Sequence, residues 1–246
     1  AVSPSEYLGF KPGDDRKLAS WDEITGYFRE LTKNSDRMRW FDMGQSTEGR
    51  PFYYVCISSP DNLRDLEEYK TIQGRLADPR SLTGDEAQEL TEKGKTIVLI
   101  SCSIHASEVG AAQMSMELAY ELETAQDART KEILDNVILL LVPSLNPDGL
   151  DMVVDWYKKY LDTTYEGSPL PFLYQKYAGH DNNRDWFMLN LVENRLTVQN
   201  IHNVWHPHIV FDLHQMGSLG FRLFVPPYMD PWDPNVDYIL RQETAE

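Results

Sequence analysis

Residues 96–102 (TIVLISC) and 136–143 (NVILLLVP) are two short apolar runs that decide the fold predicted for this chain. Continuous runs of this kind are typical of strands buried on both faces of a parallel or mixed sheet. Residues 108–123 lie between them and predict a helix, so the three segments form a βαβ unit. We therefore predict an α/β fold with a mixed, largely parallel central sheet flanked by helices on both faces.

Further elements are predicted on both sides of this unit. Three more segments are strand-like: 39–44, 52–58 and 208–213. The first two are separated by residues 45–51, whose Gly, Ser and Thr content favours a hairpin turn. The third is a buried run that ends in His214. Helices are predicted over residues 21–31, 62–76, 84–93 and 190–205, the first of them with apolar residues at the spacing that faces a core.

The length of 246 residues fits one large α/β domain. Residues 1–19 are rich in Pro, Gly and Asp and are expected to form an arm over the surface, while residues 20–246 form the domain. The chain begins with Ala rather than Met, and residues 1–12 contain no apolar signal core. We interpret this start as that of a chain without its leader and expect a secreted or periplasmic protein.

The composition excludes several classes of partner. The formal net charge of −16 argues against a nucleic-acid or anionic-membrane partner, because phosphate binding needs clustered Lys and Arg. No stretch approaches the roughly 20 apolar residues that span a bilayer. Cys56 and Cys102 both lie in apolar, strand-like runs, where a buried free thiol is the ordinary outcome.

The residues most suited to metal chemistry are His105 and Glu108, three positions apart where a strand gives way to a helix. Zinc takes imidazole nitrogen and carboxylate oxygen, so this pair is half of a site. His214, at the carboxyl end of a buried strand, is the third candidate ligand. Rival ligands are His180, His202, His206 and His208. We interpret His202 and His206 as partners of a helix C-terminus, and the three main residues also have a purely structural interpretation as a surface pair and a core histidine.

Five segments, in order over residues 44–228, resemble the zinc carboxypeptidases of the carboxypeptidase A type. They are Gly44–Pro51 (GQSTEGRP), Ile104–Glu108 (IHASE), Asn146–Gly149 (NPDG), Asp181–Trp186 (DNNRDW), and Leu213–His214 followed by Leu223–Tyr228 (LFVPPY). Each segment is modest alone, and their common order makes the resemblance strong. The resemblance implies the zinc carboxypeptidase/phosphorylase-like fold, with residues 20–246 as an incomplete catalytic domain.

The resemblance also implies an activity and a set of roles. The chain would be part of a zinc-dependent metallocarboxypeptidase, with one Zn²⁺ bound by His105, Glu108 and His214. Asn183 and Arg184 would hold the free C-terminal carboxylate of a peptide substrate, a task that suits a planar guanidinium. The alternative for these two residues is a loop ion pair of Arg184 with Asp181 or Asp185.

Neighbouring residues receive supporting roles. Asp181 would accept a hydrogen bond from the ring of His105, and Asp212 could serve His214 in the same way or only cap its strand. Asp148 and Gly149 are expected to shape a turn rather than to contact substrate.

Two departures from the family pattern stand out. The family's oxyanion-stabilising arginine is absent from residues 150–182, so Lys158, Lys159 or a different donor would have to substitute for it. The general-base glutamate of the family lies well downstream of the third ligand, so we expect it beyond residue 246 and interpret the chain as C-terminally truncated.

Two alternatives to peptide hydrolysis, and one alternative metal, remain open at this point. One is a related zinc amidohydrolase that acts on acylated amino acids, side-chain-linked glutamate or cell-wall peptides. Another is a non-catalytic metal-binding module that keeps the fold. Fe(II) is an alternative metal, because it uses a similar set of two imidazoles and one carboxylate.

Overall fold

The computed structural model describes residues 1–176, 179–216 and 234–243. It divides into two units, residues 1–214 and residues 215–246. The first unit contains the sheet and most of the helices. In the second unit the described residues form one helix, α11 (Tyr238–Glu243). The segment Leu223–Tyr228, matched to a family strand from the sequence, lies outside the described residues.

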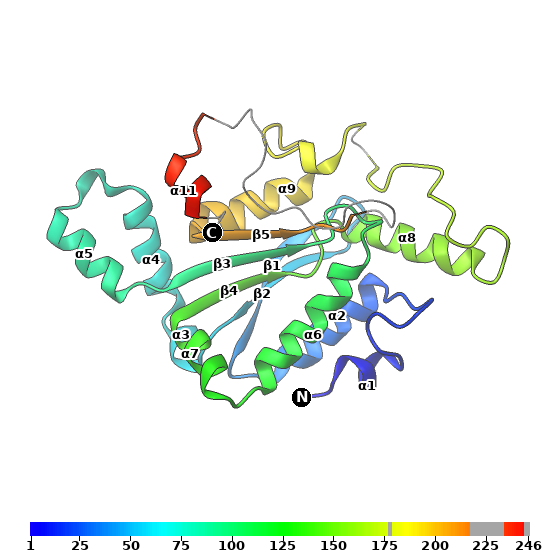
Figure 1. Ribbon diagram of the computed structural model, residues 1–246, viewed down its shortest axis with the longest axis horizontal. Helices are drawn as coiled ribbons and strands as arrows, with labels where there is room; N and C mark the ends of the chain where they lie inside the picture. Colours follow the sequence, from blue (N-terminus) through cyan, green and yellow to red (C-terminus); the bar gives the residue numbers. More distant parts are fainter. Residues whose placement is uncertain (177–178, 217–233, 244–246) are drawn as a thin grey trace. The chain divides into compact units, whose positions relative to one another are not determined.

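The first unit is built on a five-stranded sheet with the order β1-β2-β4-β3-β5. Its strands are β1 (Met38–Gln45), β2 (Pro51–Ile57), β3 (Thr96–Cys102), β4 (Val137–Val142) and β5 (Ile209–Leu213). β3 is parallel to both β4 and β5, whereas β2 is antiparallel to both β1 and β4. The predicted mixed α/β sheet is therefore confirmed, and Figure 1 shows its parallel half as the part that carries β5.

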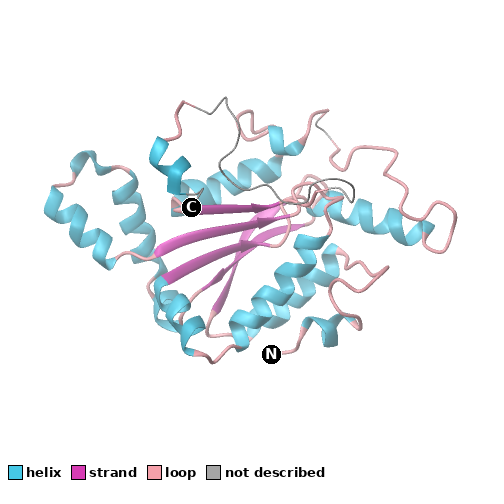
Figure 2. Ribbon diagram, viewed as in Figure 1, coloured by secondary structure: helices cyan, strands magenta, loops and turns pink. Residues whose placement is uncertain are grey.

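The predicted cover of helices on both faces is also confirmed, and β2 shows how the sequence produces it. Its residues alternate between two core clusters, because successive side chains of a strand point to opposite faces. Tyr53 and Val55 pack with residues of α2 (Trp21–Lys33) and α6 (Gly110–Thr124). Phe52 and Tyr54 pack on the other side, with Leu66 of α4 (Leu66–Ala77) and with Trp205. Figure 2 shows helices above and below the strands.

In the first long helix, α2, residues close together in the sequence specify both the start of the helix and its buried face. The Ser20 hydroxyl accepts from the Glu23 backbone N–H, and the Glu23 carboxylate accepts from the Ser20 backbone N–H, so both hydrogen bonds of a capping box are present. The residues that predicted the helix face the core and are all buried: Trp21, Ile24, Tyr27, Phe28 and Leu31. Burial of each such side chain contributes roughly 1.5–3 kcal/mol.

Three predicted helices have different bounds in the structure. The segment 62–76 is two helices, α3 (Pro60–Arg64) and α4, separated at Asp65, whose φ of −106° interrupts the helix. The segment 190–205 is α9 (Val192–Thr197), a π-helical turn (Val198–His202) and α10 (Asn203–Trp205). The helix expected from Glu108 begins at Gly110, which leaves Glu108 in the loop before it.

The remaining helices lie around this core. They are α1 (Pro4–Leu8) within the predicted arm, α5 (Gly84–Lys93), α7 (Ala128–Asn136) and α8 (Pro147–Tyr160). Short 3₁₀ turns cover Pro79–Ser81 and Asn182–Arg184. The Asn-Pro-Asp-Gly motif, expected as a loop, is the cap and first turn of α8, where the Asn146 side chain accepts a hydrogen bond from the Gly149 backbone.

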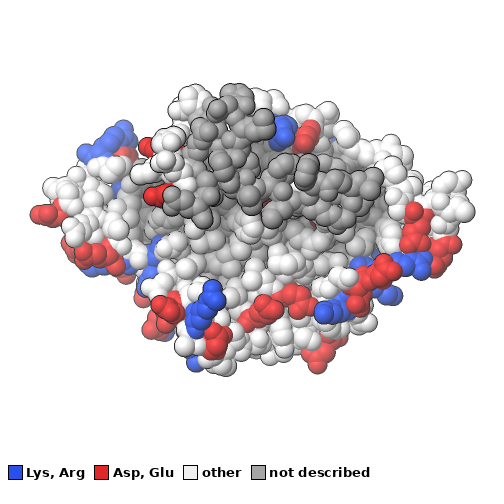
Figure 3. Space-filling view, viewed as in Figure 1, with Lys and Arg blue, Asp and Glu red and all other residues white. Residues whose placement is uncertain are grey.

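Charged residues of both signs share the surface. On the face shown in Figure 3, described Lys and Arg side chains lie beside Asp and Glu side chains. Within residues 1–176, 179–216 and 234–243, no helix has the length and apolar character needed to cross a membrane.

Candidate metal centre

His105 and Glu108 lie in the loop that joins β3 to α6. Ser103 turns the chain with a positive φ of 50°, and buried Ile104 anchors the loop in the core. The Glu108 backbone N–H donates to the His105 carbonyl at 2.9 Å. The Ser103 hydroxyl donates to the Glu108 carbonyl and accepts from the Ala112 amide, which ties the loop to the start of the helix. The result is a tight turn that places both side chains on one side.

His214 reaches the same place from the neighbouring strand. It follows β5 directly, and β5 runs parallel to β3 with Leu213 opposite Cys102. The carboxyl ends of the two strands therefore meet at one edge of the sheet, the usual place for sites in open α/β sheets. The ring centroids of His105 and His214 are 4.8 Å apart, although the two residues are 109 positions apart in the chain.

Three electron-pair donors converge at this edge. The Nδ1 atoms of His105 and His214 are 3.2 Å apart. The Glu108 carboxylate lies 2.9 Å from the first nitrogen and 3.3 Å from the second. All three side chains offer a ligand atom within 4.8 Å of one another.

This spacing fits zinc. Ligand atoms held about 2.0–2.1 Å from a tetrahedral zinc ion are roughly 3.3 Å from one another, close to the observed separations. Two imidazoles and one carboxylate are a ligand set of catalytic zinc sites, which keep a fourth position open. The three residues named from the sequence are therefore brought together in an arrangement that suits the ion.

The outer nitrogens of both imidazoles have carboxylate partners. Nε2 of His105 lies 2.9 Å from Asp181, and Nε2 of His214 lies 2.7 Å from Asp212. An ionised carboxylate only accepts hydrogen bonds, so each Nε2 carries the proton and each Nδ1 of a neutral ring faces inward with its lone pair. The resemblance implied the contact of Asp181, whereas for Asp212 the sequence left open a choice between this contact and a cap of its strand.

The electrostatics of His105 reflect this crowding. Burial lowers the pKa of the ring, but its hydrogen bonds with Glu108 and Asp181 outweigh burial, and the net pKa is raised. Burial raises the pKa of Asp181, but hydrogen bonds from the Asn183 backbone N–H and the His105 ring lower it by more. The net pKa of Asp181 is therefore depressed. Without a metal, a proton shared between these acceptor atoms reduces the repulsion between their lone pairs.

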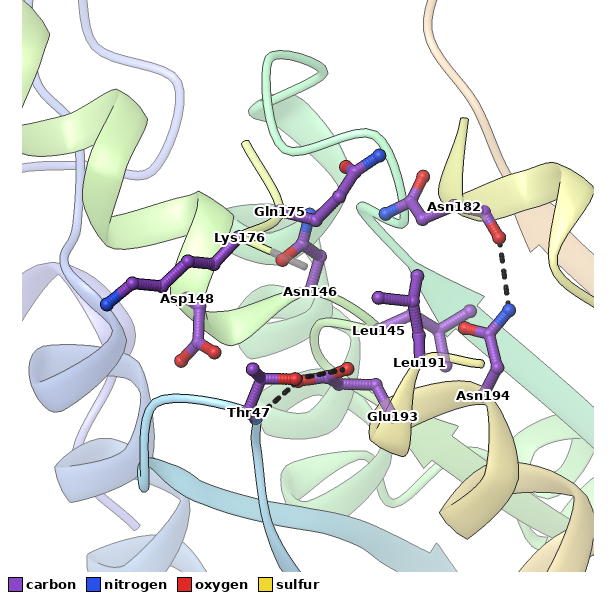
Figure 4. A pocket seen from close by; sticks show the side chains of 10 residues that line it. All are labelled: Thr47, Leu145, Asn146, Asp148, Gln175, Lys176, Asn182, Leu191, Glu193 and Asn194. Carbon is purple, nitrogen blue, oxygen red and sulfur yellow. Dashed lines mark hydrogen bonds between the residues drawn. The ribbon is translucent and has the colours of Figure 1, made fainter. Parts of the chain in front are cut away.

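A buried amide network supports the His105 loop. The Ile104 carbonyl accepts from the side chains of Asn146 at 3.3 Å and Asn182 at 2.5 Å. Asn194 donates to the Asn182 carbonyl at 3.0 Å, and Figure 4 shows this contact in the pocket that these amides line. Sequence reasoning assigned no role to Asn182 or Asn194. The only signal was the position of Asn182 inside the DNNRDW segment.

Asp148 joins two of the motifs that resembled the family. Its carboxylate accepts from the Ser46 hydroxyl at 2.5 Å, from the Glu48 amide at 2.9 Å and from the Arg50 guanidinium at 2.9 Å. The turn at 46–50 and the first turn of α8 are thereby locked together, so Asp148 is structural, as expected. Gly149 allows the backbone of α8 to approach the backbone at Tyr174, because a Cβ added at this position would clash with the Tyr174 carbonyl oxygen.

Asn183 and Arg184 belong to a 3₁₀ turn. This turn borders the metal group, as we call His105, Glu108 and His214 together. The Asn183 Nδ2 atom is 3.4 Å from Nε2 of His214, and its Oδ1 accepts from the Trp186 indole at 3.0 Å. Arg184 is exposed, and its guanidinium donates to the Asn183 carbonyl at 3.2 Å. Among the described residues, no carboxylate lies within ion-pairing distance of Arg184, so the alternative ion pair with Asp181 or Asp185 does not form.

The rival histidines have other surroundings. His180 contacts the buried carboxylate of Asp185 at 2.8 Å, and the ring of His208 accepts from the Ile97 amide at 2.9 Å. His202 lies against Trp186, and burial lowers its pKa, which disfavours the charged form that a helix C-terminus would attract. His206 ends its helix with a positive φ of 44°. Of the chain's described part, His105, Glu108 and His214 form the one group spaced for a metal.

The two lysines considered as oxyanion partners lie elsewhere on α8. Lys158 is 3.9 Å from Glu23 of α2, and Lys159 lies over the rings of Trp156 and Tyr160. Within the described residues, neither lysine contacts the group of His105, Glu108 and His214.

Comparison with known proteins agrees with this geometry. The sequence profile of the zinc carboxypeptidase family matches residues 24–206, well over half of the chain. This chain belongs to the zinc carboxypeptidase family. The predicted family is therefore confirmed, and its metal agrees with the donor set; the matched range contains the first four segments and ends before the fifth, which begins at Leu213. A search among curated proteins finds no match.

Solved zinc carboxypeptidases share the fold. A metallo-carboxypeptidase from Burkholderia cenocepacia matches with a TM-score of 0.55 and 18% identity, covering 83% of this chain and 43% of its own. Carboxypeptidase A from Helicoverpa armigera matches with a TM-score of 0.54 and 14% identity, covering 87% of this chain and 52% of its own. This chain thus spans about half the length of these structures or less.

Proposed function

We propose that the protein containing this chain is a zinc-dependent metallocarboxypeptidase that removes C-terminal residues from peptides. The observation that carries the proposal is the convergence of His105, Glu108 and His214 from two adjacent strand ends, with separations that suit one zinc ion. Membership of the zinc carboxypeptidase family supports the reaction class.

The described residues account for binding and orientation. A zinc ion held by this group supplies Lewis-acid chemistry, which activates water and polarises an amide carbonyl. Asp181 and Asp212 keep the two imidazoles in the tautomer that a metal needs. The amide network under Ile104 keeps the His105 loop in register with β5.

Arg184 and Asn183 are the proposed site for the substrate's free carboxylate. Arg184 is exposed, and a guanidinium binds a carboxylate through two parallel hydrogen bonds. Because Asn183 also borders His214, a carboxylate held by this pair lies close to the metal group. Cleavage is therefore proposed at the last peptide bond, with orientation supplying much of the rate enhancement.

The test uses the full-length protein, purified without a metal-affinity tag. Metal analysis is expected to find one zinc per chain. The protein is then incubated with peptides that end in a free carboxylate, with the same peptides amidated at the C-terminus, and with N-acyl amino acids. We expect release of single residues from the free-acid peptides only.

Three other outcomes would contradict the proposal. Turnover of N-acyl amino acids alone would identify the related amidohydrolase. Zinc binding without turnover of any amide would identify a non-catalytic module. Absence of bound metal at neutral pH, after zinc has been offered and excess removed, would remove the basis for both.

A further inference from the structure

We infer that Ser101 and Asp212, on the adjacent strands β3 and β5, form a positioning pair that orients His214 for the metal. The inference rests on the proposed zinc site and adds a residue, Ser101, that contacts neither the metal group nor substrate. The carboxylate partner of His214 is thus held between two strands, whereas Asp181, the carboxylate partner of His105, lies in a loop.

The pair is built by strand register. Ser101 and Asp212 are direct partners in the parallel pairing of β3 and β5. The Ser101 hydroxyl donates to Oδ1 of Asp212 at 2.7 Å, and Oδ2 of the same carboxylate lies 2.7 Å from Nε2 of His214. Each oxygen of Asp212 thus has one partner, and the chain of contacts runs from the buried strand to the ring.

This arrangement determines which nitrogen of His214 faces the metal group. The Asp212 carboxylate accepts a hydrogen bond from the Nε2–H group, so Nδ1 is left as the acceptor that faces Glu108 and His105. Asn183 also approaches Nε2, but at 3.4 Å, and its amide oxygen is already engaged by Trp186. The shorter contact with a charged acceptor dominates.

The two histidines are supported unequally. Asp181 caps the 3₁₀ turn Asn182–Arg184, its side chain is 40% exposed, and it accepts a hydrogen bond from the Asn183 backbone. Asp212 is 26% exposed and is held by a serine that is 3% exposed within the sheet. Ser101 is also a polar residue in an otherwise apolar part of β3. Its hydroxyl fixes the rotation of the Asp212 carboxylate and, through it, the His214 ring.

The experiment compares zinc affinities of full-length variants by competition with a chelator. Asp212→Asn is expected to weaken zinc binding roughly 10- to 100-fold, the usual effect of losing such a partner. Ser101→Ala is expected to weaken it several-fold. Because the serine acts through the aspartate, the double variant should bind zinc as Asp212→Asn does, with no further loss.

Matched controls separate positioning from general destabilisation. Ser115→Ala removes another buried hydroxyl, which donates to the Ala112 carbonyl in α6, and should leave zinc affinity unchanged. Ser101→Thr keeps a hydroxyl and should restore affinity. The absorption spectrum of the Co²⁺-substituted protein should change in Ser101→Ala and not in Ser115→Ala, since it reports ligand geometry.

The outcomes are distinguishable. If the wild-type protein binds no zinc, the proposed function fails, and the inference fails with it. If wild-type binds zinc and Asp212→Asn binds it equally well, only the inference is overturned. If Asp212→Asn weakens binding and Ser101→Ala leaves both affinity and the Co²⁺ spectrum unchanged, the role of Ser101 is overturned. If Asp212→Asn does not fold, the inference is decided by the zinc affinities and Co²⁺ spectra of Ser101→Ala and Ser115→Ala alone.

Discussion

Two polar clusters can be compared, one around Arg50 and one around His105, and they differ in how their charges are balanced. Around Arg50, one guanidinium donates to Asp151 at 2.7 Å, Asp148 at 2.9 Å and Glu48 at 3.2 Å. Around His105, the inner atoms of two imidazoles and of Glu108 are all acceptors when the rings are neutral. Among the contacts of the described residues, the first cluster contains a cation, the Arg50 guanidinium, whereas the second brings together groups that can all accept from one cation.

The contrast distinguishes structural polar groups from a candidate metal site. Buried charges are retained when partners compensate them, as Arg50 compensates Asp148. Acceptors that converge without a donor are stable only when an ion or a proton joins them. Burial or the number of acidic residues alone would not separate the two clusters.

The largest effect is expected from removing a ligand. His105→Ala should weaken zinc binding by at least roughly 1,000-fold, about 4 kcal/mol, because two remaining side chains cannot complete the site. Zinc content after dialysis against a weak chelator measures this. His206→Asn is the control: His206 is exposed with a positive φ that Asn tolerates, so zinc content should not change. Stoichiometric zinc in His105→Ala would refute the assignment.

The balanced cluster should respond in stability instead. Asp148→Asn leaves Arg50 with a weakened partner and should lower the free energy of unfolding by about 3 kcal/mol, while the metal-free and zinc-loaded proteins lose similar amounts. Denaturant titrations of both forms provide the measurement. Asp155→Asn, on the exposed side of the same helix, should change stability by less than about 0.5 kcal/mol. A selective loss of zinc affinity in Asp148→Asn would break the comparison.

Arg184 belongs to neither cluster and should affect only substrate. Arg184→Ala should lower kcat/KM for free-acid peptides roughly 30-fold, because one charged hydrogen-bonding partner is worth about 2 kcal/mol. Zinc content and stability should stay at wild-type values. Arg184→Lys should recover only part of the activity, since an ammonium lacks the planar fork. Equal kcat/KM in wild-type and Arg184→Ala would contradict the role.

The smallest effect concerns an exposed counterpart of the Arg50 cluster. Arg16, in the segment before α2, donates hydrogen bonds to the Glu166 carboxylate, which also accepts from the Asp162 backbone N–H. Together these contacts lower the Glu166 pKa to about 2. A depressed folded-state pKa gives stability that is present above the ordinary value of 4.5 and is lost as the pH falls toward 2.

Melting curves of wild-type and Glu166→Gln proteins test this dependence. Wild-type should melt at a slightly higher temperature near neutral pH, and the difference should vanish between pH 4.5 and 2. High salt should also reduce it, because exposed pairs are screened. A difference that persists at pH 2 would show that packing, rather than charge, carries the effect.

Some parts of the fold follow from local sequence. The apolar runs that became β3 and β4 predicted strands of the sheet interior, and most of their residues are buried or half-buried. The prediction of a buried strand at 208–213 is wrong in its burial: within the described residues β5 pairs with β3 alone, and Ile209, Val210 and Phe211 are about half exposed. The helix from Trp21 was predicted because the spacing of its apolar residues is a local pattern. The break at Asp65 and the late start of α6 were not predicted, because they depend on loop contacts such as that of Ser103 with Ala112.

The candidate site divides in the same way. His105, Glu108 and His214 could be named as ligands, and Asp181 as a partner, because their motifs are recognisable and the chemistry of each side chain is intrinsic. Asn182, Asn194 and Ser101 could not be assigned, because their roles are hydrogen bonds to distant parts of the chain. Asn182 meets the Ile104 carbonyl across 78 positions, and Ser101 meets Asp212 across 111.

By itself, the sequence determined the types of element, the acidic composition, the family and the donor atoms available for a metal. Tertiary structure decided that β3 lies between β4 and β5, which brings His214 to His105. It also decided which nitrogen of each ring faces inward. Periodicity and side-chain chemistry act over a few residues, whereas strand order and ring orientation are set by contacts between segments that only folding brings together.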